Sequence, residues 1–313
     1  MNSERAVIAR VIAAATNRSF VEIESTQTCT GGCIHRAELV HLSDGCRFFV
    51  KYAREQRAIE CEAAGLKALA ATQTLRIPQV IAFGKLSDAE VQPARDGKRV
   101  VLPKDHVDNC YLILEAIEEG KPKKDFWEEF GASFARLHRL GRAESFGYEH
   151  DNYIGATPQI NSWNNDWIEF FANNRLSYQL KLAINNRQAP AALIRGVEAL
   201  IDRIDEALAC EIEYPALQHG DLWSGNFLVD PSGGPVVIDP AVYYGHRECD
   251  LAMPLLFGGF PSGFLSGYQQ VWPLNEGWQQ RVAVYQLYHL LNHLNLFGGS
   301  YLGNCMETLG RIS

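Results

Sequence analysis

The most restrictive feature of this sequence is a run of nine residues, 218–226, which reads Gln-His-Gly-Asp-Leu-Trp-Ser-Gly-Asn. Asp221 precedes Asn226 by five positions, and Asp239 follows after a further thirteen. Two short apolar runs separated by the turn residues 230–234 predict a β-hairpin between Asn226 and Asp239. Because a hairpin folds the chain back on itself, the fold has to bring Asn226 and Asp239 to one point.

The interval between Asp221 and Asn226 is that of the catalytic loop of kinases. Phosphoryl transfer spreads negative charge over the transferred group, so catalysis depends mainly on positioning and charge neutralisation. Magnesium prefers hard oxygen ligands, which the amide of Asn226 and the carboxylate of Asp239 supply. Asp221 then remains to accept the proton of the attacking hydroxyl. The spacing therefore predicts a phosphotransferase that uses ATP and Mg²⁺.

Each of these residues also fits a purely structural role when it is taken alone. His219-Gly220-Asp221 fits a turn, and Asp239-Pro240 fits the boundary of a helix. The whole pattern, set between short apolar runs, is far more specific than its parts and favours the catalytic interpretation.

The order of the expected elements predicts an α+β fold with a small β-rich part followed by a larger helical part. Residues 3–16 and 56–71 have the spacing of amphipathic helices, and Ser43-Asp44-Gly45 predicts a hairpin between two strands. The polar stretch 85–109 is expected to be an exposed loop or insertion. Helices are expected at 125–140, 163–182, 190–209 and 277–297. We predict a nucleotide-binding lobe over 1–118 and a catalytic, substrate-binding lobe over 119–313.

The β-rich part contains candidates for binding a nucleotide. Lys51 ends an apolar strand, where an amine can bridge two phosphates if a helical glutamate orients it. Glu62 is the expected partner, and Glu60 is the alternative. Gly31 and Gly32 lie in a loop of small residues that allows backbone N–H groups to approach phosphates. No GxxxxGK[ST] motif occurs, so a P-loop fold is not supported.

Bulk properties restrict the partners and the compartment. The net charge of −8 gives no global electrostatic reason to bind nucleic acid or an anionic membrane. No run of about 18 apolar residues is present, which argues against a transmembrane helix. The eight cysteines are scattered and form no CxxC pair, so we expect free thiols and a cytoplasmic location.

Beyond these local patterns, the sequence resembles the fructosamine-kinase (ketosamine kinase) family, relatives of aminoglycoside phosphotransferases and choline kinases, over nearly its whole length. Two long matching stretches are the most characteristic, one around His-Asp-Asn-Tyr-Ile-Gly and one around His-Gly-Asp-Leu-Trp-Ser-Gly-Asn. The matching residues are 31–34, 49–51, 62–66, 134–138, 150–159, 167–171, 219–226 and 239–248.

The resemblance implies a protein-kinase-like bilobal fold, with a small antiparallel β-rich N-terminal lobe and a larger, mainly helical C-terminal lobe. It implies an ATP-dependent kinase of the 3-hydroxyl of ketosamines, such as fructosamine or ribulosamine adducts on amines or protein lysines. The phosphorylated product is unstable and releases the amine, so the activity removes glycation. The resemblance assigns the base to Asp221, the Mg²⁺ ligands to Asn226 and Asp239, and the phosphate-binding pair to Lys51 and Glu62.

Further roles follow from the same resemblance. Glu115 and Ile117 fall where the backbone would contact adenine. Trp223 matches a tryptophan that lies near the sugar, as an aromatic face suits a sugar ring, although a core tryptophan is the alternative. Cys33 resembles a cysteine that some members use for a redox-sensitive disulfide between subunits, with Cys29 as an alternative resolving partner. An unreactive Cys33 is the other reading, so the chain is expected to be a monomer or a redox-linked homodimer.

Two rival functions stay open at this point. A kinase of an amino alcohol or an aminoglycoside would use the same catalytic residues. A non-catalytic, nucleotide-binding redox sensor would be built around Cys33. Asp250 is expected to have a structural role, either as a helix cap or as a support of the catalytic loop through backbone N–H groups. His289 and His293 are spaced for zinc on a helix, but they lack the glutamate of an HExxH motif and are interpreted as a packed pair.

Overall fold

The computed structural model describes residues 3–29, 36–87, 108–256 and 258–312. It divides into two compact units, one formed by Met1–Ala68 and Ile77–Glu119, the other by Leu69–Arg76 and Gly120–Ser313. Each unit has a hydrophobic core of its own. Within the described residues, no helix is long and apolar enough to cross a membrane.

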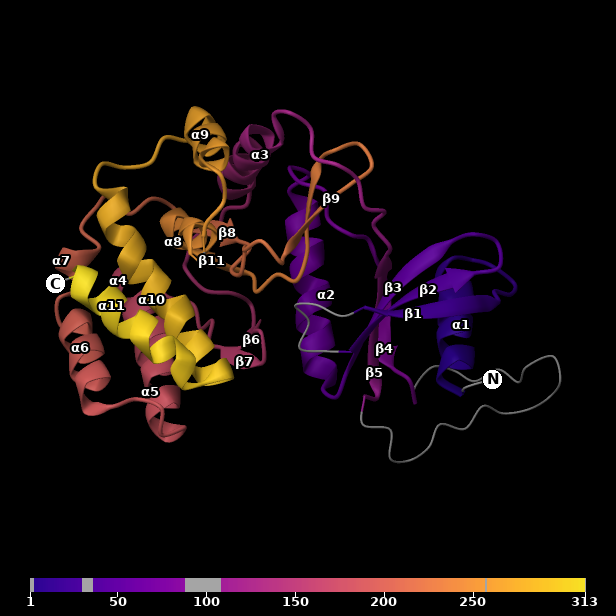
Figure 1. Cartoon of the computed structure of the whole chain (residues 1–313), viewed down its shortest axis with the longest axis horizontal. Helices are drawn as coiled ribbons and strands as arrows, with labels where there is room; N and C mark the ends of the chain where they lie inside the picture. The colour runs from indigo at the N-terminus through magenta and orange to yellow at the C-terminus, as the bar shows by residue number, and fades with distance from the viewer. Residues whose placement is uncertain (1–2, 30–35, 88–107, 257, 313) are drawn as a thin grey trace. The chain divides into compact units, whose positions relative to one another are not determined.

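The first unit is an antiparallel sheet with two helices (Figure 1). The strand order is β1-β2-β3-β5-β4, and the helices α1 and α2 lie on opposite faces of the sheet. The bounds are α1 Ser3–Ala15, β1 Ile23–Cys29, β2 Arg36–Leu42, β3 Arg47–Ala53, α2 Gln56–Ala71, β4 Val80–Lys85 and β5 Cys110–Glu115. The predicted helices 3–16 and 56–71 and the predicted hairpin are confirmed.

Side chains of β3 point alternately to the two faces of the sheet, and this determines which of them each helix covers. Val50 and Tyr52 belong to the core under α1, whereas Ala53 and the partly buried Phe49 belong to the core under α2. Successive side chains of a strand point to opposite faces. Lys51 therefore shares the face that α2 covers.

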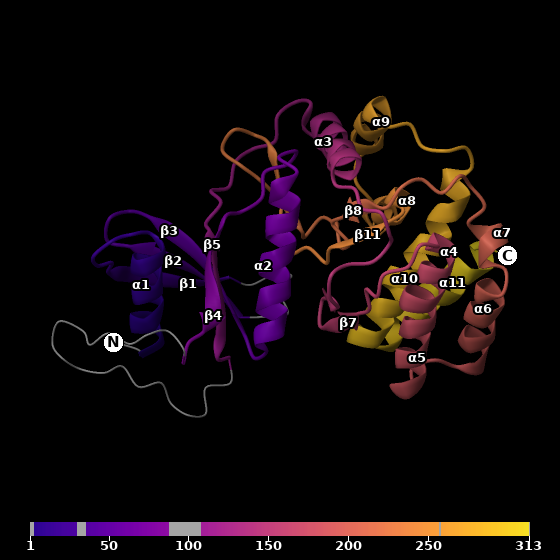
Figure 2. The ribbon, with the colours of Figure 1, turned by 180° about the vertical axis from the view of Figure 1, so that it is seen from behind.

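The second unit is mainly helical and contains short antiparallel ribbons, β6–β7, β8–β11 and β9–β10 (Figure 2). The predicted hairpin after residue 226 is confirmed as β9–β10. The helices are α3 Phe126–Leu140, α4 Trp167–Phe171, η1 Ala172–Ser177, α5 Tyr178–Asn185, α6 Ala191–Ile201, α7 Ile204–Ala207, α8 Arg247–Ala252, η2 Met253–Leu255, α9 Ser262–Val271, α10 Trp278–Phe297, η3 Gly299–Tyr301 and α11 Leu302–Ile312. The strands are β6 Asn152–Ile154, β7 Thr157–Gln159, β8 Ala216–Gln218, β9 Phe227–Val229, β10 Pro235–Val237 and β11 Tyr243–Gly245.

Two expected helices are interrupted in the structure. The helix expected over 163–182 begins only at Trp167, because Asp166 caps it by accepting the amide of Glu169 at 2.9 Å. It then passes through the π-helical turn η1, which carries the buried Arg175. The helix expected over 190–209 is divided into α6 and α7. Most of the stretch 85–109 lies outside the described residues.

Helices α3 and α9 cross so closely that only glycine fits at the contact. A Cβ at Gly131 would lie 1.8 Å from the carbonyl oxygen of Phe264, and one at Gly267 would lie 2.0 Å from that of Glu128. Because both obstacles are backbone atoms of a second helix, the helices would have to move apart to admit a side chain.

We therefore expect Gly131→Ala to lower the free energy of unfolding by about 1–3 kcal/mol, the usual cost of overpacking. Gly310→Ala is the matched control, since Gly310 is exposed in α11 and a Cβ there meets nothing within 4 Å. That control should be neutral or stabilising by about 0.5–1 kcal/mol. Urea denaturation of both variants measures the difference, and equal stabilities would contradict the close crossing.

Candidate active site

The catalytic-loop segment and the β9–β10 hairpin are joined by hydrogen bonds in the second unit. Asn226 Nδ2 donates to the backbone carbonyl of Asp221 at 2.8 Å and to its Oδ2 at 3.2 Å. The amide of Ile238 donates to the carbonyl of Asn226 at 3.0 Å. Asp239 follows directly, so the hairpin places Asn226 and Asp239 at the same end of the ribbon, as the sequence pattern requires.

The two acidic residues occupy unusual environments. Removal of water from around the carboxyl, and secondly the charge of Asp239, raise the pKa of Asp221 well above its usual value. Asp239 has a φ of +54°, in the left-handed region that few residues other than glycine adopt. Such backbone conformations persist only where the surroundings impose them, and they concentrate at functional sites.

Close packing of two backbone segments shapes the loop before Asp221. Gly220 has a φ of +82°, and a Cβ there would lie 2.1 Å from the carbonyl oxygen of Ala241. The amide of Ala241 donates to the carbonyl of His219 at 2.8 Å. The loop that carries Asp221 therefore lies directly against the segment that follows Asp239, and only glycine fits at position 220.

Asp250 supports this loop by hydrogen bonds to its backbone, one of the two roles that the sequence predicts. Its Oδ2 accepts the amide of His219 at 2.6 Å, and its Oδ1 accepts the amide of Gly220 at 2.8 Å. Burial alone would raise the pKa of Asp250, but the hydrogen bond from His138 and the backbone amides outweigh burial and lower it. The carboxylate of Asp250 thus binds the two peptide groups that precede Asp221.

His138, on α3, continues this support. Its Nε2 lies 3.2 Å from Asp250 Oδ2, and its Nδ1 lies 2.7 Å from the hydroxyl of Tyr268 on α9. Complete burial lowers the pKa of His138, which favours the neutral ring. A neutral ring that donates from Nε2 to the carboxylate accepts at Nδ1 from the tyrosine hydroxyl. Neither His138 nor Tyr268 was expected from the sequence, because each lies more than a hundred residues from its partner.

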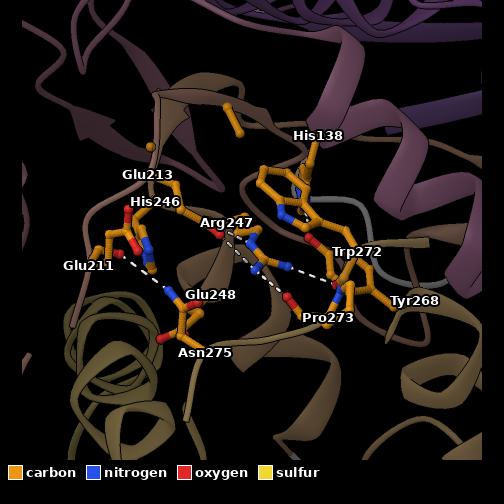
Figure 3. Close-up of polar contacts among 12 residues, drawn as sticks. His138, Glu211, Glu213, His246, Arg247, Glu248, Tyr268, Trp272, Pro273 and Asn275 are labelled. Carbon is orange, nitrogen blue, oxygen red and sulfur yellow. Dashed lines mark hydrogen bonds and ion pairs between the residues drawn. The ribbon is translucent and has the colours of Figure 1, made fainter. Parts of the chain in front are cut away.

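Helix α8 carries Asp250. Hydrogen bonds of its first two residues hold the start of this helix in place. The buried Arg247 donates to Glu213 Oε1 at 2.9 Å and to the carbonyl groups of Trp272 and Pro273 at 2.9 and 2.6 Å (Figure 3). Its guanidinium also lies 3.9 Å from the ring centre of Trp272. Glu248 accepts two hydrogen bonds from Arg281 of α10, both at 2.7 Å. These contacts define where α8 begins and therefore where the carboxylate of Asp250 lies.

The stretch His-Asp-Asn-Tyr-Ile-Gly anchors the other side of the loop. Asn152 Nδ2 donates to the carbonyl of Val242 at 2.7 Å, and Gln159 Nε2 donates to that of Ala241 at 3.0 Å. Gln159 also donates to Asn152 Oδ1 at 2.8 Å and accepts from the hydroxyl of Tyr288 at 2.7 Å. All these side chains are buried, so the network holds the backbone that follows Asp239 in place.

In the first unit, Lys51 and Glu62 form a buried ion pair. Lys51 is 4% exposed, and its Nζ lies 2.7 Å from Glu62 Oε1 on α2. Glu60, the alternative partner, accepts instead from Gln56 at 2.6 Å. The pair follows from the alternation of β3, which turns Lys51 towards α2.

The end of β5 carries the residues predicted to lie beside adenine. Glu115 is the last residue of β5, and its backbone amide donates to the carbonyl of Gln79 at 2.9 Å. Ile117 follows outside any strand and is half-buried. Between described residues, its amide and carbonyl take part in no backbone hydrogen bond.

Trp223 lies over the turn that ends the catalytic loop. The side chain is half-buried, and a Cβ at Gly225 would lie 2.4 Å from its ring. The amide of Asn226 donates to the carbonyl of Trp223 at 2.9 Å. Gly225 therefore leaves room for the indole beside the turn, and the side chain stays partly exposed.

Three predicted site residues, Gly31, Gly32 and Cys33, lie outside the described residues. His289 is buried, and His293 hydrogen-bonds the carbonyl of His289 at 2.7 Å, which agrees with a packed pair. Across the described ranges, no three His, Cys, Asp or Glu side chains group together as a metal cluster. A Mg²⁺ site with one carboxylate and one amide needs no such cluster, because phosphates and water complete its shell.

Comparison with known proteins identifies the family. Residues 5–313 match the fructosamine kinase family. The chain is 41% identical to a probable ketoamine kinase of Synechocystis sp. over 308 residues, which cover 96% of this chain and 94% of the relative. It is 36% identical to the chloroplastic protein-ribulosamine 3-kinase of Arabidopsis thaliana, over 94% of this chain and 84% of the relative.

A solved structure extends the likeness to three dimensions. A crystal structure named for a fructosamine-3-kinase of Haemophilus somnus matches with a TM-score of 0.81 at 25% identity, over 97% of this chain and 96% of that one. The expected α+β, protein-kinase-like fold is confirmed by this match and by the five-stranded antiparallel sheet that precedes the helical part. The chain belongs to the fructosamine kinase family.

Proposed function

We propose that this chain transfers the γ-phosphoryl group of ATP to the 3-hydroxyl of a ketosamine, a ribulosamine or fructosamine adduct on an amine or a protein lysine. The observation that carries the proposal is the loop 219–226, in which Asp221 and Asn226 share a hydrogen bond while Asp250 holds the preceding amides. Relatives named ketoamine kinase and protein-ribulosamine 3-kinase support the substrate class. No contact among the described residues favours an amino alcohol, an aminoglycoside or a sensor role.

Each proposed role belongs to a particular side chain or backbone group. Asp221 accepts the proton of the attacking hydroxyl, because its carboxylate belongs to the loop and is held by Asn226 Nδ2 without being needed as a metal ligand. Trp223 offers the exposed part of its indole to the sugar. Lys51, oriented by Glu62, binds phosphate oxygens of the nucleotide. Glu115 and Ile117 offer backbone groups to adenine, and Gly31 and Gly32 are proposed to approach the phosphates.

The residues after the loop fit Mg²⁺. Asn226 uses Nδ2 to donate to Asp221, which turns its carbonyl oxygen Oδ1 away from Asp221. The carboxylate of Asp239 stands at the same end of the hairpin. One amide oxygen and one carboxylate form a hard donor set that suits magnesium bound together with phosphates. The bound ion would neutralise the charge of the transferred group.

Substrate choice tests the proposal most simply. ATP consumption is measured with a ribulosamine and a fructosamine of lysine side by side, with choline and an aminoglycoside as controls. Turnover confined to the ketosamines is the expected result and fixes the preferred sugar. Turnover of a control alone would keep the kinase activity and refute the substrate class, and bound ATP without any turnover would favour the sensor.

Replacing Lys51 by methionine is expected to reduce kcat/KM for ATP by about 10- to 100-fold, the effect of losing one hydrogen bond to a charged group. Glu62 would also lose its ion-pair partner at 2.7 Å. Lys67→Met is the matched control, because Lys67 is an exposed lysine on the same helix as Glu62. Initial rates at varied ATP measure both variants, and an unchanged kcat/KM for Lys51→Met would refute the assigned role.

The cellular compartment and the oligomeric state of the enzyme are also proposals. We propose a cytoplasmic enzyme of glycated amines, with no role for nucleic acid or membrane, that is a monomer or a homodimer linked through Cys33. Cys29, the alternative resolving thiol, ends β1, and its Sγ lies 3.8 Å from the carbonyl of Gln27. Gel filtration with and without reductant tests the linkage, with Cys33→Ser as the variant that should abolish a covalent dimer.

A further inference from the structure

Three aromatic side chains of the second unit lie together, one of them exposed and two half-buried. Trp163 is 48% exposed and stacks on Tyr244, with ring centres 6.1 Å apart and planes at 27°. Tyr244 in turn lies 6.1 Å from Tyr148. We name Trp163, Tyr244 and Tyr148 the aromatic face. A contiguous, partly exposed apolar group is more informative than a single exposed side chain, because such groups mark binding surfaces.

Backbone pairing fixes the aromatic face. The amide of Gly147 donates to the carbonyl of Tyr244 at 2.9 Å, and the amide of Tyr244 returns a bond to Gly147 at 2.7 Å. Phe146 pairs in the same way with Asn164, both bonds being 2.8 Å. These bridges set Tyr148, Tyr244 and Trp163 on three adjacent segments. The backbone that carries the face is therefore held in place, and a rigid backbone lowers the entropic cost of binding a ligand.

The chain segments that carry Tyr148 and Trp163 are acidic, between Arg142 and the buried Arg175. Residues 143–174 contain five carboxylate side chains and neither lysine nor arginine. Glu149 and Asp151 are exposed beside Tyr148. Partial burial, and secondly the carboxylate of Glu149, raise the pKa of Tyr244. An aromatic surface surrounded by carboxylates is complementary to cations, because the ring faces and the carboxylates both attract positive charge.

The strand pairing also limits how far the aromatic face lies from the proposed base. Tyr244 is paired with Leu217 in the β8–β11 ribbon, four residues before Asp221. Four Cα steps of 3.8 Å and one strand separation place Tyr244 within roughly 20 Å of Asp221. That distance is an upper limit, and a few extended residues of polypeptide span it.

We propose that the aromatic face binds lysine and arginine side chains of the polypeptide that carries the ketosamine, so that the enzyme prefers adducts in basic protein segments. The inference rests on the proposed function and adds the class of macromolecular substrate. The cationic side chains stack on Trp163 and Tyr244 while Glu149 and Asp151 supply long-range attraction. The sugar and its reacting hydroxyl bind elsewhere, at the loop that carries Asp221.

A comparison of two substrates distinguishes binding at the aromatic face from binding at the catalytic site. One is a lysine- and arginine-rich peptide with a single ribulosylated lysine, and the other is the ribulosyl adduct of Nα-acetyl-lysine. We expect Trp163→Ala to raise the KM for the peptide by about 2- to 30-fold, the range of one cation–π contact, with little change in kcat. The KM for the small adduct should stay within about twofold. Glu149→Gln should weaken the dependence of the peptide KM on salt.

Phe20→Ala is the matched control, since Phe20 is 67% exposed and belongs to the first unit. It should leave both KM values unchanged. Equal peptide KM values for the wild type and Trp163→Ala would overturn the inference, and so would an equal rise for both substrates, which would place Trp163 at the sugar. If the wild type turned over neither substrate, the proposed function would fail first and this inference with it.

Discussion

Replacing Asp221 by asparagine is expected to lower kcat by about 10²- to 10⁴-fold, the usual contribution of a general base. The amide that results has nearly the same shape and still offers an oxygen to Asn226 Nδ2, which donates to Asp221 Oδ2 at 3.2 Å. The loop should therefore keep its form, and ATP should bind with nearly unchanged affinity. Single-turnover phosphorylation and nucleotide titration measure the two quantities separately.

Asp205→Asn serves as the control for that variant, because Asp205 is an exposed aspartate of α7 in the same unit. It should retain the wild-type rate. If Asp221→Asn also kept activity within a few-fold of the wild type, another group would have to accept the proton and the assignment of the base would be wrong.

Replacing Asp250 is the second change for which we expect a large effect. Alanine at this position removes the acceptor of the His219 and Gly220 amides and of His138, all of them buried. Each buried donor left without an acceptor costs about 1–3 kcal/mol, so the loss of three acceptor contacts in Asp250→Ala should lower the free energy of unfolding by about 3 kcal/mol or more. It should also lower kcat by at least about 10-fold, because the peptide groups before Asp221 lose their support.

Asp250→Asn provides the intermediate comparison, since it keeps one acceptor oxygen and replaces the other with an amide NH2 group, which faces a donor. It should fall between the wild type and Asp250→Ala in both stability and kcat. Thermal unfolding and steady-state rates below the transition of each variant separate the two effects. A folded Asp250→Asn protein with wild-type kcat would show that the loop does not depend on this carboxylate.

The parts of the site that the sequence predicts are those set by local geometry. The spacing of Asp221, Asn226 and Asp239 around a hairpin is a property of a short segment, and β9–β10 forms where the turn residues predict it. Lys51 turns towards α2 because strand side chains alternate, a rule that needs only the position of β3.

Other parts depend on tertiary contacts that no local pattern contains. Helix α9 carries Gly263 and Gly267, which oppose helix formation, and it was not expected; Gly267 is nevertheless required where α9 crosses Glu128 of α3. The interruption at η1 accompanies the burial of Arg175, whose guanidinium lies 4.0 Å from the ring centre of Tyr243. His138 reaches Asp250 across 112 residues, and no spacing rule relates such positions.

The central claim is the transfer of phosphate to a particular hydroxyl, and analysis of the product tests it most directly. A ribulosylated lysine peptide is incubated with ATP and Mg²⁺, and the phosphate is located by mass spectrometry and by phosphorus–proton coupling in the sugar. We expect one phosphate on the 3-hydroxyl, followed by release of the unmodified lysine amine. Phosphate at another hydroxyl, or ATP hydrolysis that leaves the sugar unmodified, would contradict it.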